Sequence, residues 1–203
     1  APDRPVASRL GIVGGGQRGG MRALAAAPLG VACRFIDPSP EAGAGVVAEQ
    51  ILAAYDDIDA LTELAQWADV VTFEFENVPA LALEAIEQHA VLRPSPRSLE
   101  VSQDRLAEKQ LFESLGCPVA PYRAIDSLAD LQSALGELDT PAILKTRRLG
   151  YDGKGQVRIS DAGAAGEAWE AVGGAASILE GVVAFEREVS VIVVRSHLGV
   201  TLR

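Results

Sequence analysis

The sequence predicts an α/β protein in two parts, a Rossmann-like parallel sheet followed by an α+β domain of the kind that closes as a lid. Strand-like and helix-like segments alternate up to about residue 92, and a glycine-rich turn joins the first strand to the first helix. Further along, strands still alternate with helices but also pair through glycine-rich turns. An Arg-Pro-Ser-Pro break separates the two parts, so we expect domains at residues 1–97 and 98–203.

The composition is that of a folded acidic protein. Of the 203 residues, 48% are hydrophobic and 23% are charged, and the net charge is −10. This charge argues against general nucleic-acid binding, which usually leaves a basic footprint. The chain contains no apolar run long enough to cross a membrane, no signal-peptide core at its start, and only two cysteines and two histidines. We therefore expect a cytoplasmic protein that binds neither nucleic acid nor membranes.

In the first part, apolar residues recur at the periods of strands and helices. The expected strands are residues 8–13, 31–36 and 90–92, together with a hydrophobic run that begins at Asp69. The expected helices are residues 21–27, 58–68 and 81–89.

The first turn fits the pattern G-x-G-x-x-G through Gly14, Gly16 and Gly19. Asp37 ends the second strand, where a dinucleotide-binding fold places its ribose-binding acid. A tight strand-to-helix turn, with the helix packed close to the sheet, explains the same glycines. Both interpretations stay open at this stage.

The run from Asp69 ends in Phe-Glu-Phe-Glu, and its two carboxylates, Glu74 and Glu76, are separated by one residue. On a continuous strand both would project from the same side. The carboxyl ends of parallel strands are where open α/β sheets bind ligands, so we expect a functional pair. An ordinary edge strand with one solvated face is the alternative.

In the second part, a single helix is expected from residue 98 to residue 115, with Gln103, Asp104 and Arg105 on its polar face. A helix capped by Ser127 follows an extended segment. The further expected strands are residues 142–145, 156–159 and 177–180, with a helix at 162–171 and the most strand-like run at 189–195.

The stretch from Ala142 to Gln156 is the most distinctive in the chain. It places Lys145 at the end of an apolar strand and continues into a loop that contains Gly150, Gly153 and Gly155. Such glycines let backbone N–H groups approach phosphate oxygens, which cationic side chains can neutralise. The cations of the stretch are Lys145, Arg147, Arg148 and Lys154, against the single acid Asp152. A basic surface hairpin is the alternative.

Four segments in order carry a specific resemblance. They are residues 73–79 (FEFENVP), 102–109 (SQDRLAEK), 144–156 (LKTRRLGYDGKGQ) and 178–181 (ILEG). Together they resemble the N5-carboxyaminoimidazole ribonucleotide synthetase family, the ATP-grasp carboxylases of purine biosynthesis. The resemblance extends from about Leu10 to Arg195. It implies a pre-ATP-grasp domain followed by an ATP-grasp lid domain that is incomplete at its C-terminus.

The resemblance also implies an activity and its residues. ATP would phosphorylate bicarbonate to carboxyphosphate, and the amine of 5-aminoimidazole ribonucleotide would then be carboxylated, with Mg²⁺ as the metal. Lys145 and Lys154 are the implied catalytic residues. The implied ATP contacts are Arg105, Lys145, Gly150, Tyr151, Asp152, Gly153, Lys154, Gly155, Gln156, Glu180, Gly181, Val182, Val183 and Glu188. The implied contacts of the ribonucleotide are Gly14, Gly16, Gln17, Glu74, Glu76 and Tyr151. Full-length family members are commonly homodimers.

Two departures from the family pattern stand out. The first turn of the family usually reads Gly-Gly-Gly-Gln-Leu-Gly-Arg-Met, whereas this chain has Arg18 in place of the leucine and Gly20 in place of the arginine. The second departure is length, because the family's Mg²⁺-binding Glu/Asn pair lies beyond the position of Arg203. No metal ligand is therefore assigned in this chain, which we expect to be inactive alone.

Two other functions remain in competition. One is a non-catalytic relative that only binds nucleotide. The other is an NAD-binding enzyme built on Gly14, Gly16, Gly19 and Asp37, which leaves the stretch from Lys145 to Gln156 unexplained.

Overall fold

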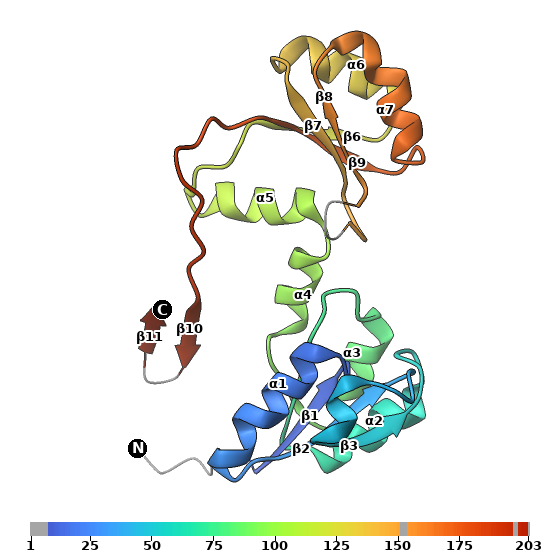
Figure 1. Cartoon of the computed structure of the whole chain (residues 1–203), viewed down its shortest axis with the longest axis vertical. Coiled ribbons are helices and arrows are strands. Elements are labelled where there is room, and N and C mark those ends of the chain that lie inside the picture. The colour runs from blue at the N-terminus through green and yellow to red at the C-terminus, as the bar shows by residue number, and fades with distance from the viewer. Residues whose placement is uncertain (1–7, 151–153, 197–198, 203) are drawn as a thin grey trace. The chain divides into compact units, whose positions relative to one another are not determined.

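The computed structural model describes residues 8–150, 154–196 and 199–202. The chain divides into two compact units (Figure 1). One unit extends to Cys117 and includes the segment that begins at Arg147, and the other takes in Pro118 to Thr146 and the chain after the glycine loop. The domain boundary between residues 97 and 98 stays a prediction. Within the described residues, no helix is both long enough and apolar enough to span a membrane.

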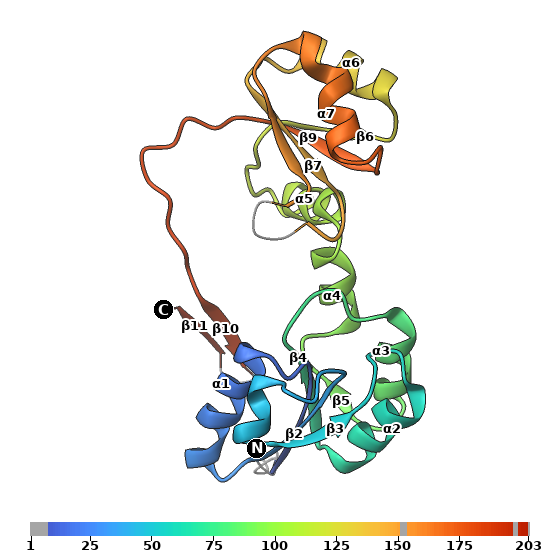
Figure 2. The same ribbon diagram turned by 45° about the vertical axis from the view of Figure 1, so that its right-hand side comes forward.

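The first unit is built on a five-stranded parallel sheet with the order β3-β2-β1-β4-β5 (Figure 2). Its strands are β1 (Arg9–Val13), β2 (Ala32–Asp37), β3 (Glu49–Leu52), β4 (Val70–Phe73) and β5 (Val91–Leu92). The expected Rossmann-like sheet is confirmed. Because the strand order reverses at β1, the carboxyl ends of β1 and β4 frame a topological switch point, where such sheets bind ligands.

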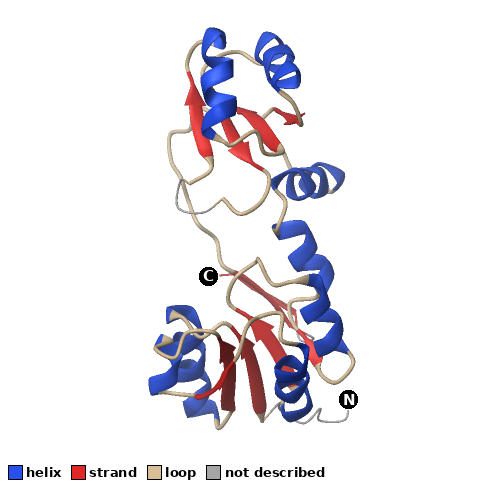
Figure 3. Cartoon of the chain, turned by 90° about the vertical axis from the view of Figure 1, so that its right-hand side faces the viewer, coloured by secondary structure: helices blue, strands red, loops and turns tan. Residues whose placement is uncertain are grey.

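Helices cover both faces of this sheet (Figure 3). The helices of the unit are α1 (Gln17–Ala26), α2 (Ile58–Trp67), α3 (Ala80–Glu87), α4 (Pro96–Ser102) and α5 (Arg105–Ser114), with 3-10 turns η1 (Ala27–Leu29) and η2 (Gly43–Val46), and α5 buries no residue. Alternate residues of each strand face opposite layers, as the pleat requires. Val13 and Ile36 pack with α2 and α3, whereas Ile12 and Phe35 pack with Ala44 of η2.

Two expectations for this unit were incomplete. Helix α1 begins at Gln17 and not at residue 21, so Gly19 and Gly20 are buried inside it. Glycine is a poor helix former, which is why the pattern placed the start later. Strand β3 was not predicted, because its four residues are only partly buried and carry no clear apolar alternation.

The single helix expected from residue 98 to 115 is wrong. The chain forms α4 and α5 instead, with a break at Gln103 and Asp104. The Asp104 side chain accepts hydrogen bonds from the N–H groups of Leu106 and Ala107 and so caps α5. An aspartate in this position competes with continuation of the preceding helix.

The second unit is an antiparallel sheet with helices on one face (Figure 1). Its strand order is β6 (Tyr122–Ile125), β9 (Ser177–Gly181), β7 (Ala142–Thr146) and β8 (Gln156–Ile159). Helices α6 (Leu128–Glu137) and α7 (Ala165–Ala171), with the turn η3 (Ala162–Ala164) before α7, follow the strands. Ala142, Leu144 and Leu179 pack in one core with α6 and α7. Strand alternation therefore directs Ile143, Lys145 and Glu180 to the opposite face.

The most strand-like run of the sequence forms only a short strand. Strand β10 (Val193–Ser196) pairs with β11 (Gly199–Leu202) in a separate two-stranded sheet, whereas residues 189–192 have no regular structure. Val189 and Ile192 are 70% and 66% exposed. High strand propensity alone does not make a strand where no neighbouring strand offers hydrogen bonds.

The close approach of α1 to the first turn predicts opposite effects for two adjacent glycines. A Cβ atom at Gly19 would lie 2.6 Å from the Gly14 carbonyl oxygen, whereas one at Gly20 would meet Ala44 Cα at 3.5 Å. We expect Gly19→Ala to lower the free energy of unfolding of the first unit by about 1–3 kcal/mol. Gly20→Ala, the matched control, should leave it unchanged or raise it by up to about 1 kcal/mol.

Urea denaturation in a Trp169→Phe background measures this difference, because Trp67 of α2 then reports on the first unit alone. Equal effects of the two substitutions would contradict the packing of α1 described above.

Candidate functional site

The glycine turn lies at the switch point of the first sheet. Gly14 has φ of +105°, a conformation that residues with a side chain rarely adopt, and its N–H donates to the Ile36 carbonyl over 3.0 Å. The N–H of Glu74 donates to the Val13 carbonyl over 3.0 Å. The turn is thereby held between the ends of β2 and β4.

Glu74 closes the turn from the β4 side. Its carboxylate oxygens accept hydrogen bonds from the N–H of Gly16 at 2.9 Å and from the N–H of Gly19 at 2.5 Å. These groups belong to the N-terminus of α1, where the helix dipole favours a negative charge. A Cβ at Gly14 would lie 2.3 Å from Glu74 Cγ, so the contact requires glycine there. These two N–H groups at the N-terminus of α1 are thus bonded to a carboxylate of the chain itself.

Asp37 closes the turn from the β2 side. It is 7% exposed, and it accepts hydrogen bonds from the N–H of Gly15 (2.8 Å), the N–H of Ser39 (2.8 Å) and the Tyr55 hydroxyl (2.7 Å). Burial alone would raise the pKa of Asp37, but these bonds outweigh it and hold the pKa below its usual value. Burial and the negative charge of Asp37 raise the pKa of Tyr55. Both carboxylate oxygens of Asp37 are already bonded to other groups of the first unit. This favours a tight strand-to-helix turn, and not ribose binding, as the reason for the G-x-G-x-x-G pattern.

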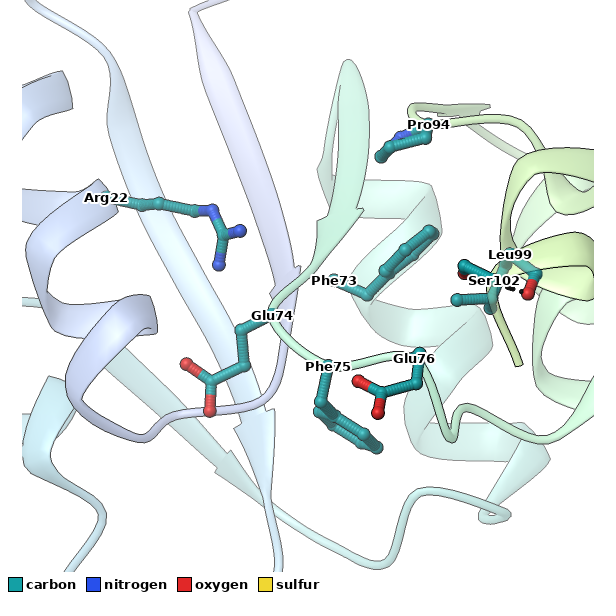
Figure 4. A pocket seen from close by; sticks show the side chains of 8 residues that line it. All are labelled: Arg22, Phe73, Glu74, Phe75, Glu76, Pro94, Leu99 and Ser102. Carbon is teal, nitrogen blue, oxygen red and sulfur yellow. Dashed lines mark hydrogen bonds between the residues drawn. The ribbon is translucent and has the colours of Figure 1, made fainter. Parts of the chain in front are cut away.

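Glu76 lies apart from Glu74. Strand β4 ends at Phe73, so both carboxylates follow the strand and the expected projection from one side does not hold. Figure 4 shows the Glu74 carboxylate directed away from Glu76. Both residues line a cavity of about 350 Å³ together with Arg22, Phe73, Phe75, Pro94, Leu99 and Ser102.

The start of the glycine loop is anchored to the N-terminus of α5. Arg147 forms a bidentate ion pair with Asp104. Its Nη2 lies 2.6 Å from Asp104 Oδ2, and its Nε lies 3.0 Å from Asp104 Oδ1. The N–H of Arg105 donates to the Arg147 carbonyl at 3.0 Å, and its guanidinium donates to the Gly150 carbonyl at 3.1 Å. Arg147 therefore holds the loop, although the sequence placed it among the phosphate-binding cations.

The anchor depends on Asp104, whose carboxylate binds Arg147. Asp104 is 4% exposed, and Arg148 Nε also lies 3.5 Å from one of its oxygens. Burial alone would raise the pKa of Asp104, but the bonds from Arg147 and from the first turn of α5 outweigh it and lower the pKa. Sequence reasoning missed this role because it assigned Asp104 to a helix surface. The sequence signal for the start of a new helix was an aspartate directly before its first turn.

A smaller cavity of about 160 Å³ adjoins the anchor. Its lining is polar, because it includes the side chains of Glu76, Glu108, Arg105 and Arg147, and Gly150 also lines it. Two predicted ATP contacts, Arg105 and Gly150, are thereby brought together with the predicted substrate contact Glu76.

In the second unit the structure brings together Lys145 and Glu180. Lys145 Nζ lies 2.6 Å from Glu180 Oε2, and the two side chains are 23% and 12% exposed. Lys145 stands opposite Ile178 and Glu180 opposite Ile143, so they are diagonal neighbours on the sheet face away from α6 and α7. A partly buried lysine paired with a carboxylate can neutralise a phosphate, while the acid accepts hydrogen bonds from a ligand.

At the end of the glycine loop, the backbone of Gly155 lies close to Thr146, the last residue of β7. Gly155 has φ of +67°, and its carbonyl accepts a hydrogen bond from the N–H of Thr146 at 2.8 Å. A Cβ at Gly155 would lie 2.6 Å from Thr146 Oγ1. Gln156 then stands opposite Lys145 at the start of β8, and Lys154 is exposed in the preceding turn. The predicted contacts Tyr151, Asp152 and Gly153 lie outside the described residues.

The remaining predicted ATP contacts follow β9. Gly181 ends this strand and donates its N–H to the Pro121 carbonyl at 2.8 Å. Val182 and Val183 are exposed beside it, at 40% and 51%. Glu188 is exposed in the irregular segment between β9 and β10. Their contact with nucleotide stays a prediction.

Among the described residues, no group of three or more histidine, cysteine, aspartate or glutamate side chains is arranged to hold a metal ion. No Mg²⁺ ligand is therefore assigned among the described residues.

Comparisons with known proteins agree with this geometry. Residues 7–103 match the family model of the ribonucleotide synthetase preATP-grasp domain, and residues 110–202 match that of the ATP-grasp domain. The two units therefore define an ATP-grasp protein with a ribonucleotide-synthetase pre-ATP-grasp domain.

Comparison with individual relatives identifies the family within this class of proteins. The chain is 50% identical to an N5-carboxyaminoimidazole ribonucleotide synthase of Brucella melitensis over 95% of its length. An N5-carboxyaminoimidazole ribonucleotide synthetase crystallised with ADP matches 96% of the chain at 43% identity and a TM-score of 0.91, over 52% of its own length. An Aspergillus clavatus enzyme in complex with ADP and 5-aminoimidazole ribonucleotide matches 97% of the chain at 26% identity and a TM-score of 0.86, over 52% of its own length.

The chain belongs to the N5-carboxyaminoimidazole ribonucleotide synthase family and corresponds to its N-terminal part. It spans about half the length of the curated relatives that it matches, 54% in the case of the Brucella protein.

The Asp104 anchor predicts a pH-dependent stability. Because the folded pKa of Asp104 is lowered, its stabilisation is complete above the ordinary value of 3.8 and is lost as the pH falls through the lower, folded value. We expect Asp104→Asn to cost about 1.5–3 kcal/mol at neutral pH, the contribution of hydrogen bonds to charged groups. The difference from the wild type should shrink on acidification below about pH 4.

Urea denaturation across this pH range, in the same Trp169→Phe background, measures the difference. Asp57→Asn is the control, because Asp57 caps α2 through the Ala60 N–H and asparagine caps a helix about as well as aspartate. A cost of Asp104→Asn that stays constant from neutral to acidic pH would contradict the ion-pair anchor.

Proposed function

We propose that the protein takes part in the ATP-dependent carboxylation of 5-aminoimidazole ribonucleotide by bicarbonate, in the cytoplasm and through a carboxyphosphate intermediate. The observation that carries this proposal is the Lys145–Glu180 pair on the face of the antiparallel sheet away from α6 and α7. Lys145 ends the strand that leads into the glycine loop, and Gln156 at the end of that loop stands beside it. A cation, an acid and the end of the glycine loop at Gln156 then belong to one sheet.

ATP fits this surface by charge and by shape. Lys145 would contact the phosphates, and Glu180 would exchange its bond to Lys145 for bonds to the adenosine end. The glycine loop, with Lys154 near its end, would lie over the triphosphate and exclude water, which would otherwise hydrolyse carboxyphosphate. Arg105 of the first unit, which donates to the Gly150 carbonyl, is a further proposed ATP contact. Mg²⁺ would neutralise charge during phosphoryl transfer.

The ribonucleotide would bind at the switch point of the first unit. Gly14, Gly16 and Gln17 form the turn there, and Glu74 and Glu76 follow β4. The N–H groups of Gly16 and Gly19 are bonded to Glu74, so a phosphate at the turn would compete with that carboxylate. This competition favours a contact of the turn with neutral parts of the ribonucleotide. We also propose that the full-length protein forms a homodimer, as is common in the family.

Replacement of Lys145 tests the nucleotide site. We expect Lys145→Ala to raise the dissociation constant for ATP at least about tenfold, because hydrogen bonds to charged groups contribute about 1.5–3 kcal/mol. It should also abolish ADP release that depends on both 5-aminoimidazole ribonucleotide and Mg²⁺ in the full-length protein.

The matched control is Arg123→Ala. Arg123 lies on β6 of the same sheet, and its ion pair with Glu137 is half exposed. Circular dichroism checks that both variants stay folded. ATP binding that is equal in Lys145→Ala and in the wild type would show that the sheet face is not the nucleotide site.

A further inference from the structure

The break between α4 and α5 consists of two residues, Gln103 and Asp104, whose side chains bond to different segments. Asp104 holds Arg147 at the start of the glycine loop. Gln103 takes no part in that anchor. Its Nε2 donates to the carbonyl oxygens of Glu76, at 2.6 Å, and Val78, at 3.0 Å. One residue of the break therefore holds the segment after β4, and the next holds the glycine loop.

The two bonds of Gln103 fix a segment that has no regular structure. Residues 74–79 lie between β4 and α3 and belong to neither. Carbonyl groups in such a segment have no ladder or helix partner, so a side chain must satisfy them. Gln103 uses both hydrogens of one amide nitrogen for this, and its acceptors flank Asn77. The Val78 side chain, which is 1% exposed, secures the same segment in the core.

Glu76 is the functional side chain that this segment carries. It lines the cavity of about 350 Å³ and also the polar cavity of about 160 Å³. Glu74 is held at its carboxylate by the N–H groups of Gly16 and Gly19. In the part of the chain that the structure describes, the Glu76 carboxylate has no such bond. The position of Glu76 therefore depends on its backbone, which Gln103 holds.

Three of the four segments that carry the family resemblance meet at this break. Residues 73–79 are bonded through Gln103, and residues 144–156 are bonded through Asp104. Arg105 follows the break directly, and its guanidinium donates to the Gly150 carbonyl at 3.1 Å. All of these groups belong to the first unit. The two residues of the break thus place the proposed substrate contact Glu76 relative to the proposed ATP contacts Arg105 and Gly150.

We propose that Gln103 is a positioning residue for Glu76. It holds the backbone on both sides of Asn77 and thereby sets the Glu76 carboxylate against the ligand, without contacting the ligand itself. A displacement of about 1 Å in a positioned group can cost on the order of 100-fold in rate, so such support matters. The identity of the ligand, 5-aminoimidazole ribonucleotide, rests on the proposed function, whereas the support of Glu76 by Gln103 does not.

Limited proteolysis with a glutamyl endopeptidase tests this support on the 203-residue chain. Gln103→Met removes both donors, keeps the length of the side chain and adds no charge. We expect cleavage after Glu76 to become at least about tenfold faster, because two hydrogen bonds that close the segment are lost. Cleavage after Glu63, within α2, should not change.

The matched control is Gln88→Met. Gln88 ends α3 as Gln103 ends α4, with the same right-handed helical backbone, but it is exposed. This variant should be cleaved as the wild type is. The inference is overturned if Gln103→Met leaves the rate of cleavage after Glu76 unchanged. It is also overturned if cleavage after Glu63 accelerates equally, since the substitution would then act on the stability of the whole unit.

Steady-state kinetics of the full-length protein separate positioning from a purely structural role. We expect Gln103→Met to raise the KM for 5-aminoimidazole ribonucleotide at least about tenfold and to leave the KM for ATP within about twofold. Gln103→Lys retains N–H donors at a similar reach, so its KM for the ribonucleotide should lie between the two. Unchanged KM values together with faster cleavage after Glu76 would assign Gln103 a purely structural role and overturn the proposal.

The two experiments also distinguish this inference from the proposed function. If the wild type releases no ADP in response to 5-aminoimidazole ribonucleotide, the proposed function fails. The proteolysis requires no ligand, so it still decides whether Gln103 holds Glu76.

Discussion

The bonding of two carboxylates to the first glycine turn is the constraint on which the rest of the first unit depends. Asp37 from the end of β2 and Glu74 from the end of β4 converge on the N–H groups of Gly15, Gly16 and Gly19. Three strand ends and the start of α1 are thereby joined at one point. The same bonds decide what the site can bind, since donors that are free for phosphate in other Rossmann-like sheets are satisfied here by the chain. Positive charge for a ligand must come from side chains instead.

The cations of this acidic protein divide into those that build the fold and those left for ligands. Arg147 belongs to the first group, because Asp104 holds it with two bonds and fixes the start of the glycine loop. Lys145 belongs to the second group, since its partner Glu180 is itself a predicted ligand contact on the same sheet face. The two groups look alike in sequence, and only their partners distinguish them.

The sequence was sufficient for both sheets, for most strands and for the position of Lys145, because these follow from apolar periodicity and ordered motifs. It was not sufficient where a local choice depends on a distant partner. The break before α5 depends on Asp104 finding Arg147, and the separation of Glu74 from Glu76 depends on β4 ending at Phe73. The run at 189–195 shows the same limit, because strand propensity does not supply a neighbouring strand.

Hydrogen–deuterium exchange with and without ATP tests the central claim most directly, namely that the nucleotide binds the antiparallel sheet and not the first glycine turn. The account predicts slower exchange in β7, in β9 and in the glycine loop that follows Thr146, with no change from Gly14 to Gly19. Protection confined to Gly14–Gly19, with β7 and β9 unaffected, would contradict it, because the nucleotide would then occupy the turn that Asp37 and Glu74 close.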